Sequence, residues 1–302
     1  MANISKTYKV AEHLFEMKMD GENHFWERMK ECYGPFEQNE DECTASKLFS
    51  LTICNEMVDK EGFALVYSNK DTVEPGFITL SVYKSENGHY FEFTQPCSDC
   101  INGCMWISAD YSQAKLFLAG SEVLQWLTFN VGVNFCFLLA TARHNTALVH
   151  ASCVTYKEKA YLFLGKSGTG KSTHSRMWLN TLENVVLMND DHPVVRVHGE
   201  GRVIAYGSPW SGKTHCYKNL HAPIGGIIRI SRAPYNKARR LSIIESYASI
   251  MTSFSGMIWE KELADGRDST IQGVIKSVPC WVMECLPNED AALVCSKAVT
   301  EI

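Results

Sequence analysis

Residues 159–191 decide the fold, and they read KAYLFLGKSGTGKSTHSRMWLNTLENVVLMNDD. The first apolar run, residues 160–164, has the length and composition of a buried strand. Directly after it begins the pattern G-x-x-x-x-G-K-[ST], with fixed positions at Gly165, Gly170, Lys171 and Ser172. Such a loop needs glycine, because its backbone N–H groups turn inward around phosphate oxygens through positive φ angles. The stretch therefore predicts a strand, a phosphate-binding loop and a helix whose positive N-terminal end supports the phosphate.

The loop also predicts what is bound. In loops of this type the lysine, here Lys171, follows the β- and γ-phosphates as a point charge, and the next hydroxyl, Ser172, is a ligand of Mg²⁺. ATP and Mg²⁺ are therefore the expected cofactors. A glycine-rich turn without a ligand is the alternative, and the flanking strand and helix disfavour it. The expected nucleotide-binding residues are Gly165, Ser167, Gly168, Thr169, Gly170, Lys171, Ser172 and Thr173.

Two neighbouring carboxylates, Asp190 and Asp191, follow the apolar strand 185–188. Side chains at this end of a strand emerge at the carboxyl edge of the sheet, where ligands of α/β folds collect. Neighbours on an extended chain point to opposite sides. One of them can then hold the metal, while the other faces the acceptor and takes its proton as a general base. A helix cap or a plain turn is the alternative for either residue, because Asp is common in both.

Phosphoryl transfer usually needs a mobile cation besides the loop lysine, since charge develops on the transferred group. We expect Arg232 to serve first, because it follows a strand end in a turn before Pro234. Lys213 is the second candidate. It closes the loop 207–213, GSPWSGK, whose Trp210 could cover the site or lie in the core.

His150 follows a short apolar run, and alone it is more typical of a structural histidine than of a catalytic one. His150, the loop GKSGTGKST and the Asp-Asp pair follow one another within about residues 147–192. This order resembles the HPr kinase/phosphorylase family and its relatives in the phosphoenolpyruvate carboxykinase-like superfamily. The resemblance implies that His150 lies beside the reacting phosphate and orients the acidic pair. It also implies that Ser172 and Asp190 hold the metal and that Asp191 is the base that activates a substrate hydroxyl.

The resemblance also predicts the fold class, an α/β protein with a P-loop mixed sheet and flanking helices. The family carries a glutamate after the acidic pair, but residues 205–213 contain no acid here, so HPr itself is not the expected substrate. Ahead of this part, short strand-like segments and a helix predict an α+β accessory domain with an antiparallel sheet. We expect the domains to span residues 1–120 and 121–302.

Composition limits the other function classes. The 302-residue chain is 45% hydrophobic with a net charge of -5, which suits a full core and gives no basic field for nucleic acid. The N-terminus lacks the apolar core of a secretory signal, so we expect a cytoplasmic protein with mostly reduced cysteines. Cys97, Cys100 and Cys104 could alternatively supply zinc thiolates. The uncharged segment 123–142 could span a membrane by length, but its polar side chains favour a buried core helix.

The leading hypothesis is an ATP- and Mg²⁺-dependent kinase that transfers the γ-phosphate to a hydroxyl, with a serine of a protein or peptide as acceptor. The expected partners are this acceptor and, in a homo-oligomer, further copies of the chain, rather than nucleic acid or a membrane. Two alternatives stay open. One is a kinase of a small hydroxyl metabolite such as free serine, and the other is a sensing module that binds ATP without transfer. The adjacent acids favour chemistry over sensing.

Overall fold

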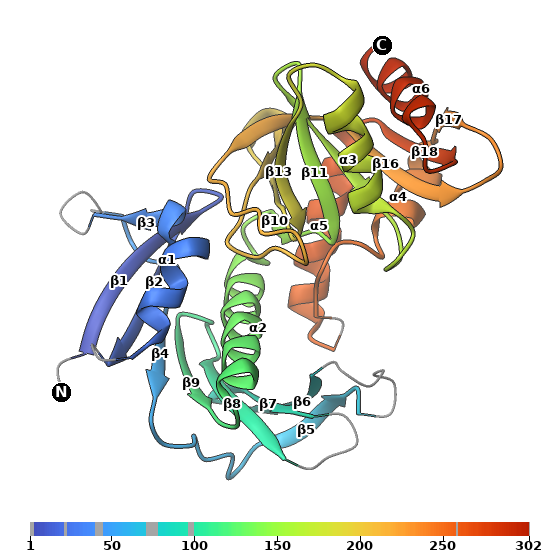
Figure 1. Ribbon diagram of the computed structural model, residues 1–302. Helices are drawn as coiled ribbons and strands as arrows, with labels where there is room; N and C mark the ends of the chain where they lie inside the picture. Colours follow the sequence, from blue (N-terminus) through green and yellow to red (C-terminus); the bar gives the residue numbers. More distant parts are fainter. Residues whose placement is uncertain are drawn as a thin grey trace. The chain divides into compact units, whose positions relative to one another are not determined.

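The structure is a computed structural model, and it describes residues 3–20, 23–39, 45–70, 78–95, 100–257 and 259–301. The chain divides into two compact units, Met1–Thr141 and Ala142–Ile302. Within the described ranges these units contain six α-helices and two mixed sheets (Figure 1), which confirms the predicted mixed α/β class. The division falls after helix α2 (Glu122–Thr141), whereas the sequence suggested a boundary near residue 120.

The sheet of the second unit is organised around β12 (Lys159–Leu164). β11 (Ala151–Tyr156) lies between β12 and β13 (Val186–Asp191) and is antiparallel to both. β12 and β13 therefore run in the same direction. Their C-terminal ends lie at one edge of the sheet, where the last residues of both strands pair with Ala151.

The other described strands of this sheet are β10 (Thr146–Leu148), β14 (Val194–Val197), β15 (Val203–Tyr206), β16 (His221–Arg232), β17 (Lys237–Arg240) and β18 (Cys280–Cys285). The long strand β16 runs parallel to β12 and β18, and its first half pairs antiparallel with β15. The short apolar runs 193–197 and 202–206, separated by the Gly-Glu-Gly turn 199–201, indicate a hairpin, and β14 and β15 form it. The basic segment 231–240, expected as a turn, instead contains β17, because its residues pair with β18.

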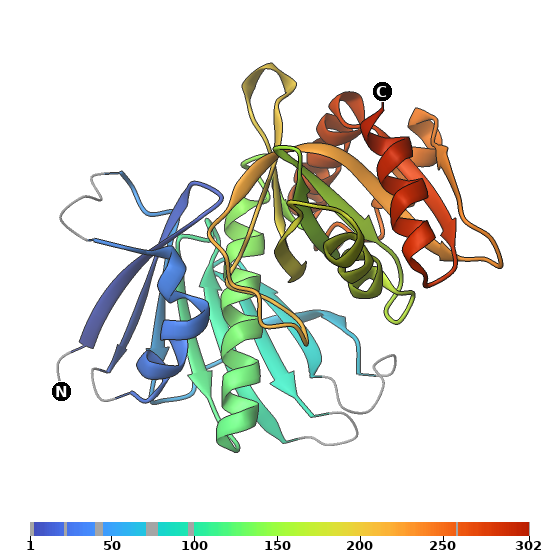
Figure 2. The same cartoon turned by 45° about the horizontal axis from the view of Figure 1, so that its top comes forward.

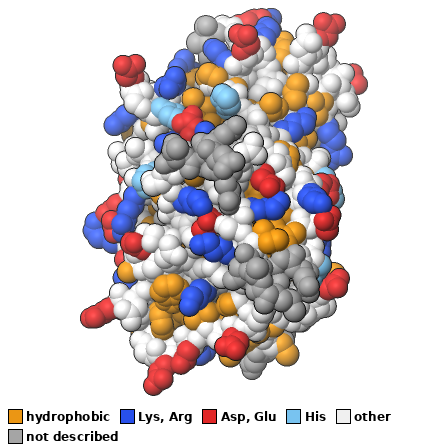
Figure 3. Space-filling view, turned by 90° about the vertical axis from the view of Figure 1, so that its left-hand side faces the viewer, with side chains coloured by type: hydrophobic (Ala, Val, Ile, Leu, Met, Phe, Trp, Pro, Cys, Tyr) orange, Lys and Arg blue, Asp and Glu red, His pale blue; other side chains and the backbone are white. Residues whose placement is uncertain are grey.

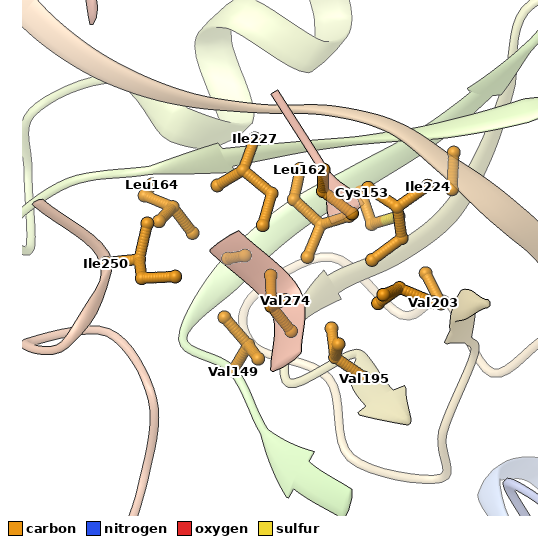
Figure 4. Close-up of a cluster of buried hydrophobic side chains, with 14 of the residues drawn as sticks. Val149, Cys153, Leu162, Leu164, Val195, Val203, Ile224, Ile227, Ile250 and Val274 are labelled. Carbon is orange, nitrogen blue, oxygen red and sulfur yellow. The ribbon is translucent and has the colours of Figure 1, made fainter. Parts of the chain in front are cut away.

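Side chains alternate between the two faces of β12, as the pleat of a strand requires. Ala160, Leu162 and Leu164 belong to one buried cluster, part of which is drawn in Figure 4, whereas Tyr161 and Phe163 belong to a cluster on the opposite face. All of these side chains are buried. The sheet is therefore covered on both faces, which explains why this strand reads as one continuous apolar run.

Helices cover both faces of this sheet, and they are α3 (Lys171–Thr181), α4 (Ile243–Ile250), α5 (Lys261–Ser277) and α6 (Glu289–Thr300). α4 and α5 contribute Ile250 and Val274 to the cluster in Figure 4. α3 and α6 lie side by side over the other face (Figure 2), where Trp178 is fully buried. Trp178 thus holds α3, and with it the end of the phosphate loop, against the sheet.

The described strands of the first unit are β1 (Asn3–Val10), β2 (His13–Asp20), β3 (Glu37–Gln38), β4 (Phe49–Cys54), β5 (Ala64–Ser68), β6 (Thr79–Ser85), β7 (Gly88–Thr94), β8 (Ile101–Ser108) and β9 (Gln113–Leu118). They form one sheet in the order β3-β1-β2-β4-β9-β8-β7-β6-β5. The expected antiparallel arrangement is wrong for β4, which runs parallel to both β2 and β9. The chain makes long crossovers there, through α1 (Phe25–Cys32) and through β5 to β8, and such crossovers permit parallel pairing.

α2 packs on the sheet of the first unit. By length and composition it could cross a membrane, but half of its most apolar window is buried in the structure. It contacts β4, β8 and β9, and its Phe129 ring lies 5.4 Å from the ring of Phe25 in α1. The Phe137 ring lies 6.1 Å from that of Phe15. α2 is therefore a core helix of this unit.

The ten described cysteines are free thiols. No group of three or more His, Cys, Asp or Glu side chains within the described ranges is placed to hold a metal ion. The alternative of a zinc site depends on Cys97, which lies outside the described residues.

Charges of both signs share the surface. On the face shown in Figure 3, Lys and Arg side chains are interspersed with Asp and Glu, in line with the small net charge of -5. Ion pairs on such a surface contribute little to stability unless they are partly buried.

Glu16 in β2 is the centre of a cluster of charges and is 8% exposed. Its carboxylate accepts hydrogen bonds from Ser5 at 2.7 Å, Ser50 at 2.9 Å and Lys47 at 2.6 Å, and Lys18 Nζ lies 2.8 Å away. Burial alone would raise the pKa of Glu16, but these donors outweigh it and lower the pKa to about 2. Folding therefore favours the charged carboxylate.

We predict that Glu16→Gln lowers the free energy of unfolding at neutral pH and that this loss shrinks on acidification. The pKa is about 2 in the folded chain against 4.5 ordinarily, so the charge stabilises the fold above about pH 4.5 and stops doing so as the pH falls towards 2. Chemical denaturation of both proteins from about pH 3 to 7 measures the difference. The exposed Glu56→Gln variant is the control, and a pH-independent loss for Glu16→Gln would contradict the account.

Candidate functional site

Residues 165–170, which are predicted to bind phosphate and are called the phosphate loop for that reason, join β12 to α3. Gly168 and Gly170 have φ values of 75° and 110°, in the left-handed region that favours glycine. At Gly165 a side chain would collide with Thr169, whose backbone N–H and Oγ1 both bond to Lys166 O, at 3.2 and 2.7 Å. The glycines therefore permit a compact loop at the N-terminus of α3, and Ser167 and Thr173 are exposed beside them.

Lys171 is folded back across the loop. Its Nζ donates to Gly165 O at 3.2 Å, and the residue is only 8% exposed. Burial lowers the pKa of Lys171, while the neighbouring Asp191 and Asp190 act in the opposite direction. The loop thus holds a nearly buried cation that has an uncharged carbonyl as its hydrogen-bond partner.

Ser172 and Asp190 lie together, although 18 positions separate them in the sequence. Ser172 Oγ donates to Asp190 Oδ1 at 2.9 Å, and Asp190 is 6% exposed. A hydroxyl and a carboxylate supply hard oxygen ligands, the type that Mg²⁺ prefers. Mg²⁺ typically takes one or two carboxylates from the protein and the rest of its ligands from phosphates and water, so this donor pair fits the ion.

Asp191 stands between two histidines. His150 Nε2 lies 3.2 Å from Asp191 Oδ1, and His192 Nδ1 lies 3.2 Å from Oδ2. The two imidazole rings are near-parallel, with centroids 6.1 Å apart. Burial tends to raise the pKa of Asp191, but hydrogen bonds from both histidines outweigh it and hold the pKa well below its usual range. Asp191 is therefore ionised and fixed in orientation, and its side chain is 33% exposed, so that a hydroxyl can reach it.

The backbone at Asp191 is strained. Its φ of 144° is rare for a residue other than glycine. Asp191 also bridges to Ser211, and the next residue, Gly212, donates its N–H to Asp190 O at 2.8 Å. Strained backbone that neighbours hold in place is concentrated at functional sites, and here it aims the two carboxylates at different partners.

Two residues of this site were not predicted from the sequence. His192 contacts Asp191, and its position directly after the pair was the available signal. Asn189 is fully buried, accepts the His192 N–H at 2.9 Å and donates to Ser208 Oγ and Trp210 O at 3.2 and 3.1 Å. Asn189 therefore fixes the loop after β15 beside the acidic pair, and Trp210, for which two interpretations were open, is a buried residue.

The two candidate cations differ in placement. Arg232 Nη2 donates to Gly168 O, so the structure brings this side chain to the phosphate loop. Lys213 is exposed and has no hydrogen bond or ion pair within the described part of the chain. It follows Ser211, which bridges to Asp191, but it does not contact the predicted site residues. Arg232 is therefore the better placed cation.

A pocket of about 530 Å³ adjoins the phosphate loop. Residues 168–170 line it together with Arg232 and with apolar side chains such as Met177, Ile230 and Leu286. This volume lies within the range of small-molecule sites. The second unit therefore combines a glycine loop that is predicted to bind phosphate, an oxygen-donor pair, an oriented carboxylate and a pocket.

No family model matches the sequence, and no curated protein matches it. Among solved structures, the chain is similar to one titled "Structure of the Hpr(Ser) kinase/phosphatase from Coxiella burnetii". The similarity covers 51% of this chain and 94% of that chain, with 12% sequence identity and a TM-score of 0.30. We therefore infer the function of the site from its own residues.

We predict that Gly168→Ala weakens the binding of inorganic triphosphate by about tenfold. An alanine held at the φ of 75° seen at Gly168 raises the conformational energy of the loop by on the order of 1–2 kcal/mol. The unliganded loop of the variant therefore relaxes to another conformation, and triphosphate must restore the strained one when it binds. The added methyl group would meet open space, so the effect reports backbone strain rather than a clash. Isothermal titration calorimetry measures the affinity.

Gly199→Ala is the matched control, because this methyl group also faces open space and Gly199 has no left-handed φ. It should bind triphosphate like the wild type. Unchanged affinity of Gly168→Ala would show that phosphate does not use the loop in this conformation.

Proposed function

We propose that this protein is an ATP- and Mg²⁺-dependent kinase that transfers the γ-phosphate to a hydroxyl, with a serine of a protein or peptide as the favoured acceptor. The observation that carries the proposal is the convergence of two pairs at one sheet edge, Ser172 with Asp190 and His150 with Asp191. One pair suits a phosphate-bound metal, and the other suits a proton acceptor.

The donor half of the reaction belongs to the loop. Lys171 leaves Gly165 O and binds the phosphate oxygens, while the N–H groups at the start of α3 face the phosphates. Ser172 and Asp190 would hold Mg²⁺, and the bound ion would neutralise charge on the phosphates. Arg232, already in contact with Gly168 O, adds positive charge on the same side and stabilises the transferred group.

The acceptor half belongs to Asp191. Its carboxylate takes the proton of the substrate hydroxyl, the hydroxyl oxygen forms the new bond to the γ-phosphorus, and the bond from that phosphorus to the β-γ bridging oxygen breaks to release ADP. His150 and His192 hold the carboxylate in place for this step. A carboxylate with a low pKa is a modest base, and this suffices when the phosphoryl transition state is loose.

Two further features support this proposal. A module that only senses nucleotide has no use for an exposed, oriented carboxylate on a strained backbone, so Asp191 favours a kinase over a sensor. The free thiols among the described cysteines support a reducing, cytoplasmic location.

We predict that Asp191→Asn abolishes phosphoryl transfer and retains ATP binding. The amide cannot take the hydroxyl proton, yet it keeps the shape of the carboxylate and leaves the loop intact. Incubation with γ-labelled ATP, Mg²⁺ and a cell extract separated into macromolecular and small-molecule fractions measures transfer, and titration with ATP measures binding. Labelling should appear in the macromolecular fraction.

Asp265→Asn, an exposed carboxylate on α5 paired with Lys261, is the matched control and should transfer phosphate like the wild type. Wild-type labelling by Asp191→Asn would show that another group takes the proton. Labelling confined to the small-molecule fraction would show that the acceptor is a metabolite and not a protein or peptide.

A further inference from the structure

Apart from Arg232 and residues 168–170, the residues that line the pocket beside the phosphate loop have no role in the transfer step. The composition of the pocket indicates what it holds. It shares residues 168–170 with the loop, so a molecule whose phosphates occupy the loop extends its other end into the pocket. Met177, Ile230 and Leu286 line it with apolar surface from α3, from β16 and from the end of β18. A flat, largely apolar ring suits this space.

Backbone donors on the apolar side of the pocket are already engaged. Ala233 N–H donates to Cys285 O at 3.2 Å, and Leu286 N–H donates to Asn236 Oδ1 at 2.9 Å. Pro287 has no N–H to offer. The residues at these three positions therefore offer apolar contact to a bound ring, and their backbones donate no hydrogen bond to its polar edge.

His174 forms a further part of the lining and is fully buried. Its Nε2 accepts a hydrogen bond from Trp178 Nε1 at 3.1 Å, so Nδ1 carries the proton of the neutral ring. Nδ1 has no hydrogen-bond partner within the described ranges. Because Nδ1 is buried as well, the imidazole closes the inner wall of the pocket and does not reach a bound base.

We propose that this pocket holds the purine base of the nucleoside triphosphate and accepts adenine and guanine alike, an inference that rests on the proposed kinase function. Both purines have a broad apolar face and ring-nitrogen acceptors, and they differ in their edge groups, an amino donor in adenine and a carbonyl acceptor in guanine. Strong discrimination needs polar groups aimed at that edge, and the donors at Ala233 and Leu286 are engaged. Pyrimidines offer a smaller ring and bind more weakly.

The test compares the affinities of the full-length protein for ATP, GTP, CTP and inorganic triphosphate, with Mg²⁺ present. Calorimetry should give ATP and GTP affinities within about fivefold of each other, both roughly tenfold or more tighter than inorganic triphosphate, because burial of the base adds apolar contact. CTP should fall between the purine nucleotides and inorganic triphosphate.

Two variants test whether the pocket causes the higher affinity of ATP and GTP relative to inorganic triphosphate. Leu286→Ala removes apolar lining and should weaken ATP and GTP binding alike by about threefold to tenfold, while the affinity for inorganic triphosphate stays unchanged. Ala233→Phe fills the pocket and should remove most of the advantage of ATP over inorganic triphosphate. Leu293→Ala on α6 is the matched control, because Leu293 is 50% exposed and Leu286 is 38% exposed, and Leu293 does not line the pocket. Circular dichroism confirms that each variant is folded.

The outcomes separate this inference from the proposed function. If ATP binds no more tightly than inorganic triphosphate, or if Leu286→Ala weakens both equally, the base does not use the pocket, although the kinase proposal stands. A preference above about thirtyfold between ATP and GTP overturns the shared purine site. If neither ATP nor inorganic triphosphate binds, the kinase proposal fails and this inference falls with it.

Discussion

The position of β11 between β12 and β13 is the constraint on which the candidate site depends. Because β11 is antiparallel to both neighbours, the loop that follows β12 and the carboxylates that end β13 meet at one sheet edge. Burial of both faces of β12 fixes the register, since a slip by one residue would exchange Leu162 and Phe163 between the faces. The pairing of β11 with β13 is irregular just before Asn189, and such bulges often re-aim side chains next to active sites. The fold thus places the acidic pair, and the bulge adjusts its direction.

Electrostatics divides the site into two halves. Lys171 lies nearly buried in the loop, Asp190 bonds to Ser172, and Asp191 bonds to His150 and His192. Two adjacent carboxylates with the same partners would repel each other, and one of them would tend to stay protonated. Separate partners instead orient the two carboxylates differently, and in the proposed kinase one serves a cation and the other takes a proton. This division is the physical reason for assigning them different roles.

Much of this arrangement could be predicted from local sequence, and the exceptions have identifiable causes. The glycine pattern and the apolar run before it predicted β12, the loop and α3, because positive φ angles and strand burial leave local signals.

Helix α5 was not predicted from the sequence, although Leu263, Ile271 and Val274 on its buried face follow helical spacing, since polar residues dominate the rest of this helix. β17 was expected as a turn, because its basic residues show no strand pattern and only pairing with β18 makes it a strand. The contacts of His192 and Asn189 depend on a loop that returns from residues 208–212, and sequence spacing does not encode such a return.

In the proposed kinase, the loop, Asp190 and Asp191 face one and the same phosphoryl group. A crystal structure with Mg²⁺ and a non-hydrolysable ATP analogue tests it most directly. We expect Lys171 Nζ to leave Gly165 O for the β- and γ-phosphates, Ser172 and Asp190 to share the metal, and the γ-phosphate to face Asp191. A γ-phosphate directed away from Asp191, or a metal held without Asp190, would contradict it.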